Sequence, residues 1–452
     1  MNIAIVGCGK IGRTLLESLT YEGHDVTAID RNAGVVGEVS NVYDVIGVIG
    51  SGTDPDTLRQ AGVEKADMFI AVTGSDETNM LACFIAKRMG AVHTVARIRN
   101  PEYNDASQGF LKKHLELSLT INPDRLTAQE LFHILRLPAA VKVEYFSQRR
   151  FEMAELRLKA DSALDGIALC DLRKKYPAEY LLGTVRRDEE VYIPGGDFVL
   201  RGGDRIGVIA APGEMQKLLK MLGLLKKQAQ SVMLLGASKT AYYLTRQLLA
   251  AGTDVTIIEQ NPDRCADMSE KFPDATVICG DGARQEILLE EGILSTDAFV
   301  SLTGFDEENI LISTFADTQR VPKVITKINR AELVAMAEKL GLESIISPQR
   351  IVADVLVRYA RALENSQGSS VETLYKLMDD KVEALEFNVL DDFRYKNTPL
   401  KNLAFKKNVR IGGILRGRRA IMPTGDEVLL PGDKVVVLAA SQRLQDLTDV
   451  IR

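Results

Sequence analysis

Residues 3–12 read IAIVGCGKIG, a short apolar run followed at once by glycines at positions 7, 9 and 12. The run predicts a buried strand, and the apolar spacing that continues after Gly12 predicts a helix. Between a strand and a helix, the first glycine permits a tight turn, the second lets the backbone approach a pyrophosphate, and the third allows close helix–sheet packing. Asp30 ends the next apolar run, where an acidic residue binds ribose hydroxyl groups. This stretch therefore predicts the first βαβ unit of a nucleotide-binding fold.

The same pattern occurs twice in the 452-residue chain. The glycine-rich turn recurs as GASKTA at 236–241, and Asp30 recurs as Glu259 after the same interval. Further along each half, residues 71–79 (AVTGSDETN) correspond to residues 301–309 (SLTGFDEEN). These matches keep the same order in both halves, which is typical of a duplicated architecture. The chain is therefore predicted to be a tandem duplication.

Each half divides into a larger α/β part and a smaller α+β part. In the larger part, short β-branched runs alternate with helical patterns, which indicates βαβ units and a parallel sheet. The smaller part has short alternating strands joined by Gly-Gly-Asp turns. The fold class is thus α/β, a tandem duplication of a Rossmann-like parallel-sheet domain followed by a small α+β module. The expected domains are residues 1–137 (Rossmann-like), 141–225 (small module), 230–363 (Rossmann-like) and 371–452 (small module).

Local patterns predict individual elements and linkers. In the first Rossmann-like domain the expected strands are 3–6, 26–29, 45–49, 68–72 and 92–98, and the expected helices are 11–19 and 76–89. In the first small module the expected strands are 180–186, 191–193 and 205–209, and the expected helices are 169–176 and 213–222. The polar residues 364–370 (ENSQGSS) are the clearest linker, and residues 226–231 are expected to join the halves.

Ligands of parallel sheets bind outside the carboxyl ends of the strands, so the ends of several strands supply further candidates. Thr73 could bond to ribose or phosphate, Arg97 could neutralise a phosphate, and Arg31 could lie along an adenine or reach a phosphate. Asp30 would repel a 2′-phosphate, which favours NAD or another adenine nucleotide over NADP. The acidic pair at 76–77 is interpreted as complementing a helix dipole. The candidates of the first half are Gly7, Cys8, Gly9, Lys10, Ile11, Gly12, Asp30, Arg31, Thr73, Gly74 and Arg97.

The second copy has lost two of its three glycines. Ser238 replaces Gly9, and Ala241 replaces Gly12. Alanine is tolerated at the third position, but serine at the second crowds the approach of a pyrophosphate. Both a weakened nucleotide site and a purely structural role therefore remain open for this half. Its candidates are Gly236, Ser238, Lys239, Thr240 and Glu259, with Thr303, Gly304 and Lys327 at the positions of Thr73, Gly74 and Arg97.

Composition argues against several other classes. The net charge of −6 gives no general attraction to nucleic acid or to an anionic bilayer. The sequence has no run of roughly 18 apolar residues and begins with a strand rather than a basic leader, so we expect a chain that is neither membrane-spanning nor secreted. The five cysteines lack a C-x-x-C pair. We expect them to be small buried residues of a protein in a reducing cytoplasm. The four histidines are scattered and predict no metal site.

The sequence favours binding without chemistry. A dehydrogenase needs a positioned acid or base beside the nicotinamide, and the small modules offer no convincing set of catalytic groups. There is also no Gly-x-x-x-x-Gly-Lys-[Ser/Thr] motif for P-loop hydrolysis. An NAD-dependent oxidoreductase remains the alternative, and a regulator of another cation or amino-acid transporter is a third possibility.

The repeated combination of a nucleotide-binding fold, an Asp-Glu-Thr-Asn helix start and small modules with Ile-Pro-x-x-Asp and Gly-Asp turns resembles the tandem RCK (regulator of potassium conductance) domain family. The resemblance covers essentially the whole chain, including residues 96–103 (ARIRNPEY). It implies a cytoplasmic regulatory or gating subunit of a potassium uptake channel, controlled by NAD(H) or ATP/ADP. It also implies a homo-oligomeric ring, a homotetramer, held on the cytoplasmic face of the membrane by a TrkH-like channel subunit. The departure at Ser238 puts equal ligand binding by the two halves in doubt.

Overall fold

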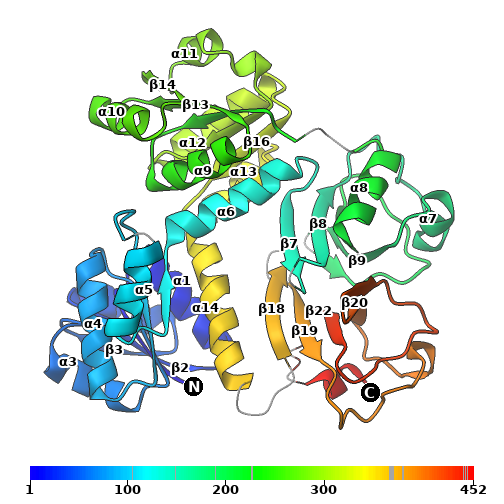
Figure 1. Cartoon of the computed structure of the whole chain (residues 1–452), viewed down its shortest axis with the longest axis horizontal. Coiled ribbons are helices and arrows are strands. Elements are labelled where there is room, and N and C mark those ends of the chain that lie inside the picture. The colour runs from blue at the N-terminus through cyan, green and yellow to red at the C-terminus, as the bar shows by residue number, and fades with distance from the viewer. Residues whose placement is uncertain are drawn as a thin grey trace. The chain divides into compact units, whose positions relative to one another are not determined.

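A computed structural model describes the whole chain except residues 104, 148, 189, 225–227, 366–370, 379–380, 441, 443 and 445. The chain forms two compact units, each built from two separate segments. One unit combines Met1–Leu131 with Ser231–Ala360, and the other combines Phe132–Gln230 with Arg361–Arg452. The first unit holds both parallel sheets, and the second holds both small antiparallel sheets (Figure 1).

The first parallel sheet has the strand order β3-β2-β1-β4-β5-β6. Its order reverses between β1 and β4, which is where ligands bind in folds of this type. The strands are β1 (Asn2–Val6), β2 (Asp25–Asp30), β3 (Val45–Ile49), β4 (Met68–Ala71), β5 (His93–Arg97) and β6 (Leu119–Ile121). The helices are α1 (Lys10–Tyr21), α2 (Ala33–Val42), α3 (Pro55–Gln60), α4 (Asp76–Met89), α5 (Asp105–His114) and α6 (Pro123–Arg136), with a short 3-10 turn at Val63–Lys65.

The second parallel sheet repeats this topology in the order β14-β13-β12-β15-β16-β17. The strands are β12 (Ser231–Leu235), β13 (Asp254–Glu259), β14 (Thr276–Cys279), β15 (Ala298–Ser301), β16 (Lys323–Lys327) and β17 (Ser344–Ile346). The helices are α9 (Lys239–Ala250), α10 (Pro262–Lys271), α11 (Gln285–Glu290), α12 (Asp306–Thr318), α13 (Ala331–Lys339) and α14 (Pro348–Asn365), with a 3-10 turn at Ile293–Ser295. The predicted duplication of a Rossmann-like domain is confirmed.

Helix α4 shows how the local sequence sets an element. The Ser75 hydroxyl accepts a hydrogen bond from the Thr78 N–H and caps the start of the helix. The first turn is acidic and the last turn is basic, which complements the helix dipole at both ends. Gly90 follows with a φ of +128°, a conformation that other residues rarely adopt, and ends the helix. The observed bounds of α4 are those predicted.

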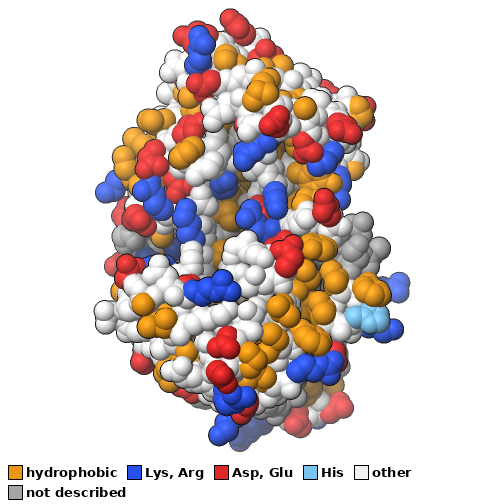
Figure 2. Space-filling model, turned by 90° about the vertical axis from the view of Figure 1, so that its left-hand side faces the viewer, with side chains coloured by type: hydrophobic (Ala, Val, Ile, Leu, Met, Phe, Trp, Pro, Cys, Tyr) orange, Lys and Arg blue, Asp and Glu red, His pale blue; other side chains and the backbone are white. Residues whose placement is uncertain are grey.

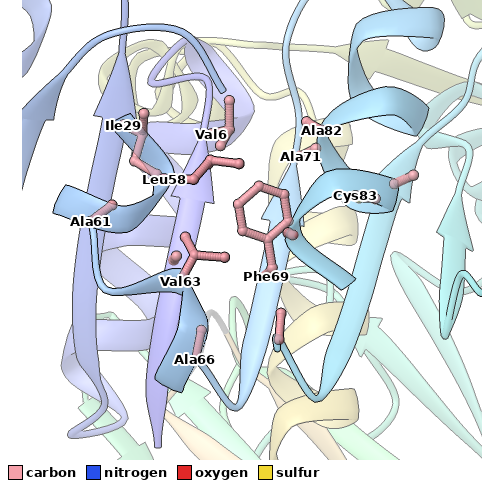
Figure 3. Packing of buried hydrophobic residues seen from close by; sticks show 14 of the residues in the cluster. Val6, Ile29, Leu58, Ala61, Val63, Ala66, Phe69, Ala71, Ala82 and Cys83 are labelled. Atoms are coloured by element: carbon pink, nitrogen blue, oxygen red, sulfur yellow. The ribbon is translucent and has the colours of Figure 1, made fainter. Parts of the chain in front are cut away.

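One core cluster of the first fold lies between the sheet and helices α3 and α4. Figure 3 shows Phe69 of β4 among Val6, Leu58 and Val63, with Cys83 of α4 beyond it. Small residues on α4 let this helix approach the sheet closely, and Phe69 fills the space that remains. Full burial of one such aromatic ring stabilises the fold by about 1.5–3 kcal/mol.

The last helix of each parallel-sheet fold reaches the other fold. At the start of α6, the Asn122 amide donates to the Tyr243 hydroxyl of α9 at 3.0 Å. Conversely, Tyr359 of α14, the last helix of the second fold, packs edge-on against His93 of β5 in the first fold, with the ring centroids 6.3 Å apart. The two folds of this unit are therefore joined by exchanged helices, an arrangement that the repeats alone did not predict.

The second unit contains two related antiparallel sheets, with orders β10-β9-β11-β8-β7 and β18-β19-β22-β20-β21. The first comprises β7 (Lys142–Phe146), β8 (Phe151–Arg157), β9 (Tyr180–Arg187), β10 (Glu190–Tyr192) and β11 (Arg205–Ala210), with α7 (Leu169–Lys175) and α8 (Pro212–Met221). The second comprises β18 (Val371–Leu377), β19 (Val382–Asn388), β20 (Val409–Arg416), β21 (Arg419–Ile421) and β22 (Lys434–Ala440), with 3-10 turns at Leu400–Asn402 and Leu447–Val450. The first module has the expected α-helices beside its antiparallel sheet, whereas the described part of the second has the corresponding sheet with 3-10 turns in place of α-helices.

The Gly-Asp turns of the small modules are structural. Asp204 is buried and accepts two hydrogen bonds from the Arg187 guanidinium, both at 2.8 Å. Asp433 and Arg416 repeat this pair at 2.9 Å. A two-bonded guanidinium–carboxylate contact fixes geometry as well as charge, so each turn is held against a strand of its own sheet.

The predicted linkers fall largely outside the described residues. Residues 366–370 of the stretch 364–370, and residues 226 and 227 of the stretch 226–231, are among those not described. The boundaries drawn after residues 137 and 363 stay predictions, although α6 and α14 run across the division between the two compact units. Among the described residues, no helix combines the length and the apolar character needed to cross a membrane.

Candidate nucleotide-binding site

A crevice of about 680 Å³ opens at the carboxyl ends of β1, β2 and β4, at the point where the strand order reverses. Nine of the eleven candidates of the first half line it, namely Gly7, Gly9, Lys10, Ile11, Asp30, Arg31, Thr73, Gly74 and Arg97. The side chain of Cys8 is buried in the core instead, and Gly12 packs against the glycine turn. The fold thus brings most of the predicted residues to one place.

The three glycines have different physical roles. Gly7 has a φ of +96°, and a Cβ there would lie 2.9 Å from the Thr73 nitrogen. At Gly12 a Cβ would lie only 2.0 Å from the Gly7 carbonyl oxygen, so any other residue would force helix and turn apart in this fold. A Cβ at Gly9 would meet no described atom within 4 Å, although Gly9 lines the crevice. The fold therefore requires Gly7 and Gly12, whereas the absence of a side chain at Gly9 keeps space open in the crevice.

The start of α1 faces this open space. Gly9 is the N-cap residue, and none of the described side chains caps the helix. The first N–H groups of a helix lack partners within the helix, and they carry its positive partial charge. Such an end is suited to bind a phosphate group.

Asp30 has a role that the motif did not reveal. One carboxylate oxygen accepts a hydrogen bond from the Cys8 N–H at 2.8 Å, and the other accepts from the Asn32 N–H at 2.9 Å. Asp30 therefore holds the glycine turn in place while its carboxylate lines the crevice. Each oxygen has a second acceptor position, so these bonds leave capacity for ribose hydroxyl groups.

Asn79 is a structural residue of the site that the sequence did not single out. Its side-chain oxygen accepts from the backbone N–H of Thr73 at 2.8 Å and from the Thr73 hydroxyl at 2.7 Å. Its amide nitrogen donates to the Arg97 carbonyl at 2.9 Å. Asn79 is fully buried and joins the ends of β4 and β5. The Thr-Gly-x-Asp-x-x-Asn pattern occurs in both halves, and this repetition could have indicated the role of Asn79.

Asp76 has a second role in addition to the one expected. Its carboxylate accepts hydrogen bonds from the backbone N–H groups of Arg99 and Asn100, both at 2.8 Å. The residue lies in the first turn of α4, where it complements the helix dipole, but it also fixes the loop after β5. Asp306 does the same in the second half, accepting from the N–H groups of Asn329 and Arg330.

Residues of the second fold complete the first crevice. Thr240, Lys327, Asn329 and Gln349 all line it. Thr240 was expected at the second crevice, but it lies at the first, where its hydroxyl donates to Asp124 at 3.1 Å. The structural reason is the exchanged helix α6, which brings Asp124 against the start of α9.

Three cationic side chains give this region an excess of positive charge. Burial, and next the neighbouring Arg99, lower the pKa of Arg97, and the Arg97 Nε has no hydrogen-bond partner among the described residues. Arg99 is paired with Asp124 through two hydrogen bonds of 2.7 and 3.2 Å. Lys327 donates to the Leu302 carbonyl at 3.0 Å, and burial lowers its pKa to about 8. A buried guanidinium such as that of Arg97, whose Nε has no partner among the described residues, favours an anionic ligand.

The second fold has its own crevice, of about 610 Å³. It is lined by Gly236, Ser238, Lys239 and Glu259 from the candidate set, together with Thr303, Gly304 and Lys327. Arg99 and Lys327 line both crevices, so two cations are shared between them.

Ser238 changes the helix start in this second crevice. Its hydroxyl accepts a hydrogen bond from the Ala241 N–H at 3.3 Å and caps α9. Glu259 repeats the role of Asp30, accepting from the N–H groups of Ala237 at 2.7 Å and Asn261 at 2.9 Å. The scaffold is thus retained, while one of the N–H groups that α1 leaves open is occupied in α9.

The cysteines are only partly as expected. Cys8, Cys83 and Cys265 are buried, but Cys170 and Cys279 are exposed. Burial raises the pKa of Cys8 to about 12 and keeps this thiol in its neutral form. The expectation of uniformly buried cysteines was therefore wrong for two of the five.

Fold and crevices together define a class, that of proteins with two Rossmann-like folds, each followed by a small antiparallel sheet. The TrkA-N domain family matches residues 3–115 and 232–348, and the TrkA-C domain family matches residues 153–223 and 384–452. These matches span most of the chain, and the chain belongs to the TrkA family. The resemblance seen in the sequence is confirmed.

Individual relatives agree with this assignment. The chain is 31% identical over 453 residues to a "Trk system potassium uptake protein TrkA homolog" of Archaeoglobus fulgidus, covering 100% of both chains. It is 28% identical to the "Trk system potassium uptake protein TrkA" of Vibrio alginolyticus, covering 98% of this chain and 96% of that protein. These names describe potassium uptake proteins and not enzymes.

Solved structures support the fold. The GsuK RCK domain has a TM-score of 0.63 at 16% identity, covering 97% of this chain and 92% of that chain. The GsuK channel bound to NAD has a TM-score of 0.62 at 16% identity, covering 97% of this chain and 77% of that chain.

Proposed function

We propose that this protein is a nucleotide-binding regulatory subunit of a potassium uptake system, acting at the cytoplasmic face of the membrane. The observation that carries the proposal is the open N-terminus of α1, which faces a crevice that also contains Asp30 and the poorly compensated Arg97. Membership of the TrkA family supports the assignment of this protein to a potassium uptake system. The names of the relatives give no support to the alternative of an NAD-dependent oxidoreductase.

The first crevice is the principal site in this proposal, and its ligand is NAD(H) or ATP/ADP. The phosphates of the bound nucleotide lie against the N–H groups at the start of α1, beside Gly9 and Lys10. The Asp30 carboxylate accepts hydrogen bonds from the ribose hydroxyl groups of the nucleotide. Arg97 and Lys327 are placed to balance further phosphate charge. Support for these ligand classes comes from the solved GsuK structures, which are described as bound to NAD and to ADP.

The second crevice is a weaker site in the proposal, with the same scaffold but a capped helix start. Arg99 and Lys327 line both crevices, so a phosphate bound in one changes the electrostatic potential in the other. Ligands that bind two arrangements of the folds with different affinity shift the balance between them. No catalytic group is needed for such control.

The partner in the proposal is a TrkH-like channel subunit, on which the protein assembles as a homotetramer. Basic and acidic side chains are interspersed over the face shown in Figure 2, so this face offers charged lipid no purely basic surface. Symmetric assembly would present the same face several times to one channel.

Reconstitution in vesicles tests the proposal. The channel subunit is incorporated alone or with this protein, and potassium flux is measured with NADH, ATP or ADP. We expect flux to depend on both the protein and the nucleotide, and Asp30→Ala to reduce the nucleotide response. The same preparation is followed at 340 nm with candidate substrates, where turnover of NADH would indicate the oxidoreductase instead. Flux that is indifferent to protein and nucleotide would contradict the proposal.

A further inference from the structure

Two cysteines of the second parallel-sheet fold lie next to one another beside Glu259. Cys279 is the last residue of β14, and in the parallel pairing of β13 with β14 it stands opposite Glu259. Cys265 lies early in α10, and its Sγ is 3.2 Å from the Glu259 carbonyl oxygen. Neighbouring strands are about 4.8 Å apart, so both sulfurs are held around one backbone position.

Packing alone does not require sulfur at these two positions. In the first fold, Asp30 stands opposite Ile49 in the strand pairing, and the residue of α2 that corresponds to Cys265 is Val36. The exposure pattern is the same in both folds, because Val36 and Cys265 are buried whereas Ile49 and Cys279 are exposed. The second fold therefore carries thiols at two positions where the first fold has hydrocarbon side chains.

We propose that Cys265 and Cys279 form a reversible disulfide at the edge of the second crevice when the protein meets hydrogen peroxide. The exposed Cys279 reacts first. Its thiolate attacks a peroxide oxygen, the O–O bond breaks, and the sulfur becomes a sulfenic acid as hydroxide leaves. The Cys265 sulfur then attacks the sulfenic sulfur, the S–O bond breaks, and a second hydroxide leaves.

The step is balanced in atoms and electrons. The two sulfurs lose two electrons, which reduce the peroxide, and the two thiol protons convert the two hydroxides to water. Burial raises the pKa of Cys265 to about 11, so this residue is a thiol at neutral pH and the exposed Cys279 is the first to react. A small-molecule thiol reverses the link by thiol–disulfide exchange, with one disulfide formed for each one broken.

A disulfide between Cys265 and Cys279 would affect the lining of the second crevice. Gly280, Asp281 and Gly282 follow Cys279 directly and line the second crevice together with Glu259. A disulfide ties this segment to α10 and removes the thiol donor of Cys265 from the Glu259 carbonyl. This effect on nucleotide binding rests on the function proposed above, whereas formation of the disulfide does not.

Peptide mapping of the full-length protein tests the proposal. Trypsin cuts after Arg264, Lys271 and Arg284, so the two cysteines fall in different peptides that stay joined only through a disulfide. After mild hydrogen peroxide treatment we expect the joined peptide in the wild type, its loss after reduction, and its absence in Cys265→Val and Cys279→Ile. These substitutions use the side chains of the first fold and so preserve the packing.

Cys170→Ala is the matched control, because Cys170 is also exposed but lies in the other compact unit. This variant should form the joined peptide as the wild type does. Oxidation of Cys279 to sulfinic acid without the joined peptide, or equal oxidation of Cys170 and Cys279, would overturn the proposal. A joined peptide with unchanged NADH affinity supports the modification site and counts against the proposed second nucleotide site.

Discussion

The two crevices of this protein share one scaffold but differ in whether the N-terminus of the adjoining helix has a side-chain cap. In the first, Gly9 leaves the N-terminus of α1 without a side-chain cap and keeps the space before it open. In the second, the Ser238 hydroxyl caps α9. The first N–H groups of a helix either donate to a capping side chain of the same protein or remain available to an anion. Here the residue at the N-cap position, Gly9 or Ser238, determines which of the two occurs.

The remaining parts of the two crevices have diverged much less. Asp30 and Glu259 each accept two backbone hydrogen bonds from the glycine turn and from the following loop. Asn79 and Asn309 each join the fourth and fifth strands of their sheet. The scaffold has therefore been retained in both halves, and the difference is concentrated where a phosphate would bind.

The largest effect should come from the third glycine of the first fold. Gly12→Ala would place a Cβ 2.0 Å from the Gly7 carbonyl oxygen, so the helix must move away from the turn. We expect a loss of about 3 kcal/mol, at the upper end for overpacking. The reverse change, Ala241→Gly, removes a methyl group and should cost about 1 kcal/mol. Urea unfolding measures both, and equal midpoints for Gly12→Ala and the wild type would contradict this account.

Exchanging the helix starts should change ligand binding more than stability. A Cβ at Gly9 meets no described atom, so Gly9→Ser should fold normally. It should weaken NADH binding by about 1–2 kcal/mol, because the hydroxyl caps the helix and occupies phosphate space. Ser238→Gly should strengthen binding at the second crevice and lower stability by only a few tenths of a kcal/mol. Calorimetry with NADH checks both variants. Loss of binding in Ser238→Gly, with none in Gly9→Ser, would reverse our ranking of the two crevices.

A smaller effect concerns Lys327, which lines both crevices. Burial lowers the pKa of Lys327 to about 8 in the folded protein, whereas an unfolded lysine has a pKa of about 10.4. Between these values the unfolded state binds more protons, so the destabilisation caused by Lys327 is constant below about pH 8 and decreases as the pH rises toward about 10.4. The stability advantage of Lys327→Met over the wild type should therefore be larger at pH 7 than at pH 9.5. Urea midpoints at the two pH values measure this difference, and a pH-independent difference would show that Lys327 is not buried as described.

The sequence predicted the parts of the site that depend on local structure. The turn at Gly7, the bounds of α4 and the position of Asp30 follow from patterns within a few residues of each other. Contacts between the folds were missed, because nothing near Asp124 in the sequence indicates that the exchanged helix α6 carries it to the other fold. Thr240 was assigned to the wrong crevice for the same reason. The cap at Ser238 could have been predicted, since serine is a preferred N-cap residue.

The most direct test of the central claim compares two acidic residues with the same scaffold role. Asp30→Ala and Glu259→Ala each remove a carboxylate that accepts two backbone N–H groups, so each serves as the stability control for the other. We expect Asp30→Ala to weaken the tightest NADH binding by about 1–3 kcal/mol, the cost of lost charge-assisted hydrogen bonds. Glu259→Ala should leave that tight binding unchanged. Unchanged affinity in folded Asp30→Ala, or loss of tight binding in Glu259→Ala alone, would contradict the assignment of the first crevice as the principal nucleotide site.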